Sequence, residues 1–309
     1  MILFLQEILG IKSKVCMSIA SKFKSFCQNI RINQNVVDDI SYRYGRITKQ
    51  LNIDFWDTES SINHSLYVGS YGRDTDIHAS DIDLLMRLPW GMREKYDDYI
   101  SNGQSALLQA VRDSLKNTYS TSHIKGDGQV VQINFDDDVS FEIVPGFLYT
   151  DGSYSFPDTN DGGSWKITNP KSEIRAIRTI NNECNVNLKN LCRMARSWKD
   201  QWNVPIGGLL IDTLACNFLI NWKNKDKSYL YYDYMTRDFF EYLKDQSEDQ
   251  EYWLAPGSKQ YVWRKGNFEY KALRCYNLSL EAIDYEERKM TYSADEKWRE
   301  IYGPKFKGE

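Results

Sequence analysis

Histidine is scarce in this chain of 309 residues, and no two cysteines form a CxxC pair. The three histidines, at positions 64, 78 and 123, are scattered and have no other soft ligand nearby, so we assign none of them to a metal or to catalysis. A CxxC pair is typical of a zinc site or a redox centre. We therefore predict reduced, buried thiols in a cytoplasmic protein. The six cysteines lie at positions 16, 27, 184, 192, 216 and 275.

Long apolar runs and an excess of basic residues are also lacking. No apolar run approaches the roughly 18 residues that cross a bilayer, so we expect no membrane partner. The N-terminus, MILFLQEILGI, contains Glu7 and lacks a basic segment and a cleavage site, so it is predicted to start an amphipathic helix rather than to be a signal peptide. The net charge is −4. Because long nucleic acids are bound by a basic face, we expect no long nucleic-acid partner.

The first half of the chain mixes helical and strand patterns. Residues 1–30, 33–56 and 94–117 are predicted to be helical. SLYVGS and SDIDLLMRLP are predicted strands, and QVVQINF, the acidic turn 136–138 and VSFEIVPGF are predicted to form a hairpin. The inner stripe of the helix 94–117 is predicted to be Tyr96, Ile100, Leu107, Leu108, Val111 and Leu115.

A polar segment, residues 151–169, divides the chain. It is rich in Gly, Asp, Asn and Ser, and is predicted to be a long irregular loop. Asn169 then caps a helix that begins at Pro170. Further helices follow, and the tail YGPKFKGE is predicted to be flexible. The predicted helices are 171–182, 187–202, 206–224, 231–246 and 267–290.

Two acids, Asp81 and Asp83, head the apolar strand SDIDLLMRLP. Because side chains alternate along a strand, both carboxylates point the same way while Ile82 faces the core. Neighbouring carboxylates raise each other's pKa unless a cation neutralises them, and hard divalent cations prefer oxygen ligands. The pair taken alone also fits an exposed edge strand or a turn.

A third acid, Glu142, lies among apolar neighbours in FEIVPGF. If its strand pairs beside residues 81–88, three carboxylates converge and can hold two Mg²⁺ ions about 3.5–4 Å apart, an arrangement suited to phosphoryl transfer. Gly69 and Ser70 precede the acids. Glycine permits close backbone approach, and the serine hydroxyl with nearby N–H groups can hold a terminal phosphate.

These residues carry a family resemblance. VGSYGRDTDIHASDIDLLMRLP resembles the signature of the DNA polymerase β-type nucleotidyltransferase superfamily: Gly-Ser, a variable loop, then two acids separated by one apolar residue. Within it, the match is closest to the bacterial cGAS/DncV-like nucleotidyltransferases, the second-messenger synthetases of anti-phage signalling. FEIVPGF, FPDTNDGGSWKITNP and LCRMARSWKDQW also resemble family segments. The resemblance covers most of the chain.

The resemblance implies an α+β fold: a polymerase β-like nucleotidyltransferase core with a mixed sheet, joined to a helical domain like the C-terminal half of oligoadenylate synthetases, with a nucleotide cleft between them. We place the core with its N-terminal helices at residues 1–168 and the helical domain at 169–309. By position, Asp81, Asp83 and Glu142 match the catalytic, metal-binding acids, although many relatives have Asp at the third place. Gly69 and Ser70 match the turn that holds phosphate.

The implied activity is a cyclic oligonucleotide synthase. It would join nucleoside triphosphates into a cyclic di- or trinucleotide with release of pyrophosphate, using two Mg²⁺ ions that Mn²⁺ can replace. The product would diffuse to a downstream effector. In some relatives the extreme C-terminus is attached to a partner, so regulatory or conjugating proteins are candidate partners.

Basic residues follow one face of the helix 187–202. Arg193, Arg196 and Lys199 are spaced by three, and they either neutralise a triphosphate or form a solvated surface. Arg196 lies near the place where relatives often have a phosphate-contacting lysine. Gly207 and Gly208 stand where relatives commonly have a serine-bearing turn, and a backbone N–H at the helix start can substitute.

Several side chains have two open interpretations. Arg73 either contacts a phosphate or pairs with Asp74 or Asp76. Trp165 and Tyr154 either stack on a base or anchor their loop to the core. Two other functions also stay open: transfer of a nucleotide to RNA ends or to a small-molecule acceptor, and a non-catalytic nucleotide-sensing module.

Overall fold

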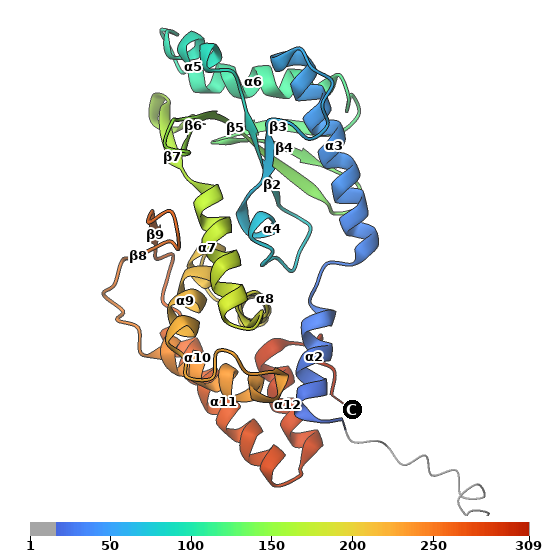
Figure 1. The fold of residues 1–309 in the computed structure, drawn as a ribbon, viewed down its shortest axis with the longest axis vertical. Helices are drawn as coiled ribbons and strands as arrows, with labels where there is room; N and C mark the ends of the chain where they lie inside the picture. Colours follow the sequence, from blue (N-terminus) through green and yellow to red (C-terminus); the bar gives the residue numbers. More distant parts are fainter. Residues whose placement is uncertain (1–16, 309) are drawn as a thin grey trace, which may run out of the picture.

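The chain forms a body built around a β-sheet and a second body built of helices, as Figure 1 shows. The computed structural model describes residues 17–308. The predictions for residues 1–16, which include the start of the N-terminal helix and Cys16, lie outside this range. None of the helices in the described part is long and apolar enough to cross a membrane.

The sheet has seven strands, with β1-β2-β5-β4-β3 as its main order and β6 and β7 added beyond β5. Strands β2 and β5 are parallel, and every other neighbouring pair is antiparallel. The strands are β1 (Ser65–Tyr67), β2 (Ile82–Arg87), β3 (His123–Asp127), β4 (Val130–Asn134), β5 (Ser140–Leu148), β6 (Tyr154–Asp158) and β7 (Ser164–Thr168).

Helices cover one face of this sheet. Ile82, Leu84 and Met86 of β2 are buried in one apolar cluster with residues of α3 (Gln34–Trp56) and α6 (Gly103–Lys116). Since side chains alternate along a strand, Asp83 and Arg87 face the opposite side. The predicted helix 33–56, the two predicted strands and the hairpin around residues 136–138 are confirmed.

The prediction of one helix over residues 94–117 is wrong. The structure has α5 (Trp90–Asp97) and α6, separated by a short turn. Asn102 ends the turn, because its side chain accepts a hydrogen bond from the backbone N–H of Ser105 and so caps α6. Ile100, predicted to lie on the inner stripe, is fully exposed in the turn.

The prediction of an irregular loop over residues 151–169 is also wrong. Strands β6 and β7 form an antiparallel hairpin there, with a short 3₁₀ turn, Asn160–Gly162, between them. The polar composition misled because β7 is mostly exposed, with Trp165 and Ile167 as its two apolar residues. The cap at Asn169 and the helix start at Pro170 are confirmed.

The helical body contains the second apolar cluster. The five predicted helices of this half are confirmed, with small differences in their ends. The prediction missed α12 and the short hairpin of β8 and β9. The elements are α7 (Pro170–Glu183), α8 (Asn187–Gln201), α9 (Gly208–Asn221), η2 (Tyr229–Tyr231), α10 (Tyr232–Lys244), β8 (Tyr252–Leu254), β9 (Tyr261–Trp263), α11 (Glu269–Glu287) and α12 (Thr291–Tyr302).

Helix α2 (Ile19–Asn29) packs on the helical body although it precedes the sheet in the chain. Phe23 makes edge contacts with Trp298 and Phe306, and buried Lys22 forms ion pairs with Glu286 and Asp295. The chain therefore visits the helical body twice. The division at residue 168 stays a prediction. Helix α2 precedes that point in the chain but packs with the helices that follow it.

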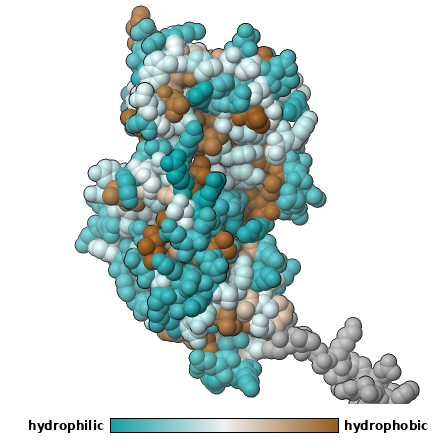
Figure 2. All heavy atoms as spheres, viewed as in Figure 1, coloured by the Kyte–Doolittle hydropathy of each residue, from teal (hydrophilic) through white to brown (hydrophobic). Residues whose placement is uncertain are grey.

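The predicted flexible tail is instead anchored. Tyr302 and Phe306 are buried in the helical cluster, and the rings of both contact Phe26. The prediction missed this because two aromatic residues in a short polar stretch give no periodic pattern. The buried, unpaired state predicted for the cysteines is confirmed for the five in the described part: Cys27, Cys184, Cys192, Cys216 and Cys275. Figure 2 shows a mostly hydrophilic surface with scattered apolar patches.

We expect Phe306→Ala to lower the free energy of unfolding by about 3–5 kcal/mol, because it leaves a cavity where a fully buried ring was. Chemical denaturation followed by circular dichroism measures this. Lys307→Ala, at an exposed neighbouring position, is the matched control and should change stability by less than about 0.5 kcal/mol. Equal stability of both variants would show that the tail does not anchor the body.

Candidate active site

The Gly69-Ser70 turn lies directly against Asp83. Gly69 has a φ of +60°, and a Cβ atom there would stand 1.7 Å from Oδ2 of Asp83. The backbone N–H of Val68 also donates to the Asp83 carbonyl at 2.9 Å. Position 69 therefore requires glycine for both its backbone conformation and its contact. The turn opens the short helix α4 (Gly69–Arg73).

Asp83 and Glu142 are opposite each other on the parallel strands β2 and β5, so the predicted pairing is confirmed. Neighbouring strands are about 4.8 Å apart, and both side chains point to the same face. Burial raises the pKa of Asp83 to about 6; the charges of Glu142 and Asp81 add to this, while Arg73 opposes it. Burial also raises the pKa of Glu142, with Asp81 and Asp127 adding to the effect.

These three carboxylates supply the donor chemistry of a hard divalent cation. Asp81 is exposed just before β2, whereas Asp83 and Glu142 are half-buried. Within residues 17–308 no three acidic, histidine or cysteine side chains already form a metal-binding cluster. The carboxylates repel one another around a common region, and a divalent cation would relieve that repulsion. The chemistry of the donor set thus fits Mg²⁺.

A cavity of about 170 Å³ lies between the sheet body and the helical body, beside these acids. Ser70 and Asp81 line it on one side, and Arg196 and Lys199 of α8 line it on the other, with Gly208 at the start of α9. The structure therefore brings together most residues predicted to bind phosphate. Their roles stay predictions. The third basic residue of that helix, Arg193, is buried and donates to the carbonyls of Asp74 and Asp76 and to the Asp74 carboxylate.

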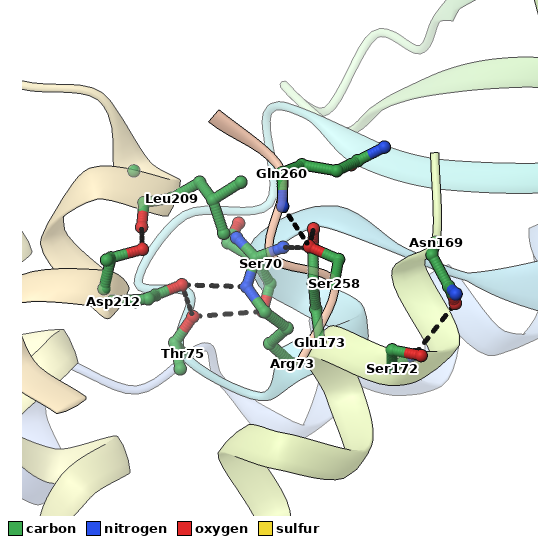
Figure 3. A network of polar contacts seen from close by, with 12 residues as sticks. Ser70, Arg73, Thr75, Asn169, Ser172, Glu173, Leu209, Asp212, Ser258 and Gln260 are labelled. Atoms are coloured by element: carbon green, nitrogen blue, oxygen red, sulfur yellow. Dashed lines mark hydrogen bonds and ion pairs between the residues drawn. The ribbon is translucent and has the colours of Figure 1, made fainter. Parts of the chain in front are cut away.

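Arg73 has partners that the sequence did not suggest. Its Nε donates to Oδ2 of Asp212 at 2.9 Å, and its Nη1 lies 3.5 Å from Oε2 of Glu173 (Figure 3). It pairs with neither Asp74 nor Asp76 in an ion pair. Since its guanidinium is buried and directed at these carboxylates, Arg73 positions the turn rather than reaching into the cavity.

Asp212 is the centre of this network and has no solvent exposure. It accepts hydrogen bonds from Arg73, from Thr75 Oγ1 at 3.0 Å and from Arg196 at 2.6 and 3.0 Å. Burial alone would raise the pKa of Asp212, but Arg196 and Arg73 bring it below the ordinary value. Sequence reasoning missed this residue, although an acid inside the apolar helix GLLIDTLAC is the same signal that identified Glu142.

The aromatic residues near the hairpin anchor it. Trp165 donates from Nε1 to Asp97 at 2.8 Å, and its ring lies 3.9 Å from the guanidinium carbon of Arg93. Tyr154 is buried in a small cluster with Val68 and Leu85. Both side chains therefore have structural partners, which favours the anchoring interpretation over base stacking.

Residues 17–181 match the family model described as the Second Messenger Oligonucleotide or Dinucleotide Synthetase domain. The match covers more than half of the chain. The chain belongs to this family. It is therefore a nucleotidyltransferase, as the sequence predicts. No curated protein matches the chain.

Solved structures of related synthases share the fold. CdnC of E. coli MS115-1, in a complex with HORMA-deltaN, is 16% identical with a TM-score of 0.66, and the match covers 92% of this chain and 98% of CdnC. CdnG of Bradyrhizobium diazoefficiens, solved with GTP, is 8% identical with a TM-score of 0.67 and coverages of 94% and 96%. DncV of Vibrio cholerae, a cyclic AMP-GMP synthase, is 15% identical with a TM-score of 0.60 and coverages of 79% and 69%. The predicted polymerase β-like fold is confirmed.

We expect Asp212→Asn to lower the free energy of unfolding by about 3–5 kcal/mol, because it leaves two buried guanidinium groups without their shared anion. Thermal and chemical denaturation measure the change. Asp200→Asn is the matched control: Asp200 is exposed and its carboxylate pairs with the exposed His78, so its loss should cost less than about 1 kcal/mol. A small effect at Asp212 would mean that the network adds little to the joining of the two bodies.

The raised pKa of Asp83 predicts a pH dependence of stability in EDTA. The folded protein binds the Asp83 proton more tightly than the unfolded chain, so the contribution of Asp83 to stability falls as pH rises from about 4, the unfolded pKa, to about 6. Other acids, among them Asp233 and Asp212, also have shifted pKa values, so the contribution of Asp83 is isolated by comparison with a variant. We expect the stability of Asp83→Asn relative to the wild type to increase across this window and to level off above it. Denaturation of both proteins at a series of pH values measures this, and a difference that stays constant or shrinks as pH rises would contradict it.

Proposed function

We propose that the chain is a cyclic oligonucleotide synthase that joins nucleoside triphosphates into a cyclic di- or trinucleotide and releases pyrophosphate. The observation that carries this proposal is that Asp83 lies beside Glu142 in the sheet and directly against Gly69. Ser70 and Asp81, which are close to Gly69 and Asp83 in the chain, line the cavity between the two bodies. Family membership and the likeness to CdnC, CdnG and DncV support it.

In the proposed reaction Ser70 and the backbone of its turn hold the triphosphate of the donor nucleotide, and Lys199 neutralises part of its charge from across the cavity. Arg196 already pairs with Asp212, so it contributes mainly by fixing α8. Two Mg²⁺ or Mn²⁺ ions held by Asp81, Asp83 and Glu142 would supply Lewis-acid chemistry at the attacking hydroxyl and the leaving pyrophosphate.

A ribose hydroxyl of a second nucleotide attacks the α-phosphorus in line with the departing pyrophosphate. The hydroxyl proton passes to the carboxylate of Asp83 or Glu142. The linear product then turns over in the cavity, and the same step closes the ring.

The biological setting is part of the same proposal. The product would act in the cytoplasm as a second messenger of anti-phage defence, with an effector that recognises it. ATP and GTP, present in structures of CdnC and CdnG, are the first substrates to test. CdnC has been solved with HORMA-deltaN, which makes a regulatory protein partner a further candidate.

We expect Asp81→Asn with Asp83→Asn to give a folded protein that forms no product from ATP, GTP, CTP and UTP with Mg²⁺ or Mn²⁺. Pyrophosphate release and mass spectrometry of nuclease-digested products are the measurements. Asp136→Asn with Asp138→Asn removes two acids from an exposed hairpin turn and is the matched control, which should keep full activity.

The acceptor is tested in the same assay. A cyclase needs nucleoside triphosphates alone, whereas a transferase to RNA ends or small molecules releases pyrophosphate only when its acceptor is added. No pyrophosphate release from the wild type under either condition would favour a sensing module. Wild-type activity in the double variant would refute the role of the two aspartates.

A further inference from the structure

A second cavity, of about 440 Å³, lies on the same face of the sheet as Asp83 but shares no lining residue with the cavity beside the acids. It is formed by the end of β2, by β1 with the residues before it, by β6 and by the first turn of α7. Leu85 and Tyr154, which form an apolar cluster with Val68, are part of its wall. Its lining residues are Asn63, His64, Ser65, Leu66, Leu85, Arg87, Tyr154 and Lys171.

The lining is basic and contains no acid. Within the described part of the chain, Arg87 and Lys171 are in none of the ion pairs, and Nε of Arg87 is buried without a hydrogen-bond partner. Their contacts are with rings: the Arg87 guanidinium lies 5.0 Å from the Trp56 ring, and Lys171 Nζ lies 5.6 Å from the Tyr154 ring. Two positive charges therefore face one cavity without a protein anion to neutralise them.

The wall around these charges is already rigid. Fully buried Asn52 donates from Nδ2 to the carbonyls of Ser60 and Asn63, both at 2.8 Å. Its Oδ1 is thus left to accept the Nδ1–H of His64 at 2.7 Å. The His64 ring also stacks on Trp56, 3.9 Å away at 15°. A cavity whose wall is fixed before binding loses little conformational entropy when a ligand enters.

We propose that this cavity is a second binding site, for a small ligand that carries a phosphate or a carboxylate group. Arg87 lines the cavity, and its guanidinium offers the planar donor fork that matches either group. Lys171 supplies a mobile point charge at the rim, where it is exposed. The inference is independent of the proposed synthase activity, because none of its residues takes part in that reaction.

The test is ¹⁹F NMR of the full-length chain labelled with 5-fluorotryptophan, with Trp56→Phe to assign the Trp56 signal. Trp56 contacts both Arg87 and His64, so it reports directly on the cavity. Potassium phosphate and potassium succinate are titrated separately at constant ionic strength. We expect a saturable shift of the Trp56 signal with at least one of them. A response to phosphate alone or to succinate alone identifies the group that the site prefers.

Arg87→Met with Lys171→Met should weaken the response at least about tenfold, because two charge-assisted contacts are lost. Lys171→Met alone, at an exposed position, should weaken it a few-fold and serves if Arg87→Met does not fold. Lys24→Met, on the exposed side of α2, and Lys199→Met, in the cavity beside the acids, should leave it unchanged. No saturable shift with either salt, or an unchanged shift in the double variant, would overturn the proposal.

Discussion

A buried carboxylate shared by two guanidinium groups joins the halves of this protein. Asp212 of the helical body accepts hydrogen bonds from Arg196 of the same body and from Arg73 of the sheet body. Desolvating three charged groups is costly, and the loss is offset only when every partner is in place. The two bodies therefore have one favourable relative position. Since Arg73 ends the short helix that Gly69 begins, that position also fixes the Gly69-Ser70 turn against α7 and α9.

Fully buried Asp212 and half-buried Asp83 have opposite pKa shifts, because their neighbours carry opposite charges. Asp212 touches two arginines, which hold its pKa down despite complete burial. Asp83 faces two other carboxylates, and the nearby Arg73 is already bonded to Asp212 and Glu173. Arg73, the cation that would neutralise Asp83, thus joins the two bodies instead. The negative charge of the acids is therefore left without a neutralising group of the protein, and a divalent metal ion would neutralise it.

The sequence predicted the parts of the site that depend on local pattern. Alternation placed Asp81 and Asp83 on one strand face, and Glu142 stood out as an acid among apolar residues. The contacts of Arg73 were beyond prediction, because Asp212 lies 139 residues away in the chain. Local pattern also failed at β7, whose polar composition predicted a loop although the segment is a strand. It failed again at Asn102, where periodicity predicted one continuous helix but the Asn102 cap begins a new one. Phe306 shows the same limit, since one buried ring in a polar tail has no periodicity to reveal it.

Strand β2 has an acid near its start and a base at its end on one sheet face, yet the two do not neutralise each other. Asp83 and Arg87 are four residues apart, about 13 Å along an extended strand. That distance is far beyond the roughly 4 Å within which an ion pair forms, and Leu85, which packs with Val68 and Tyr154, lies between the two charges on the strand. Asp83 and Arg87 therefore do not neutralise each other's charge. A site for cations and a site for anions can coexist on one strand, because the apolar cluster between them prevents direct contact and excludes a shared pool of water.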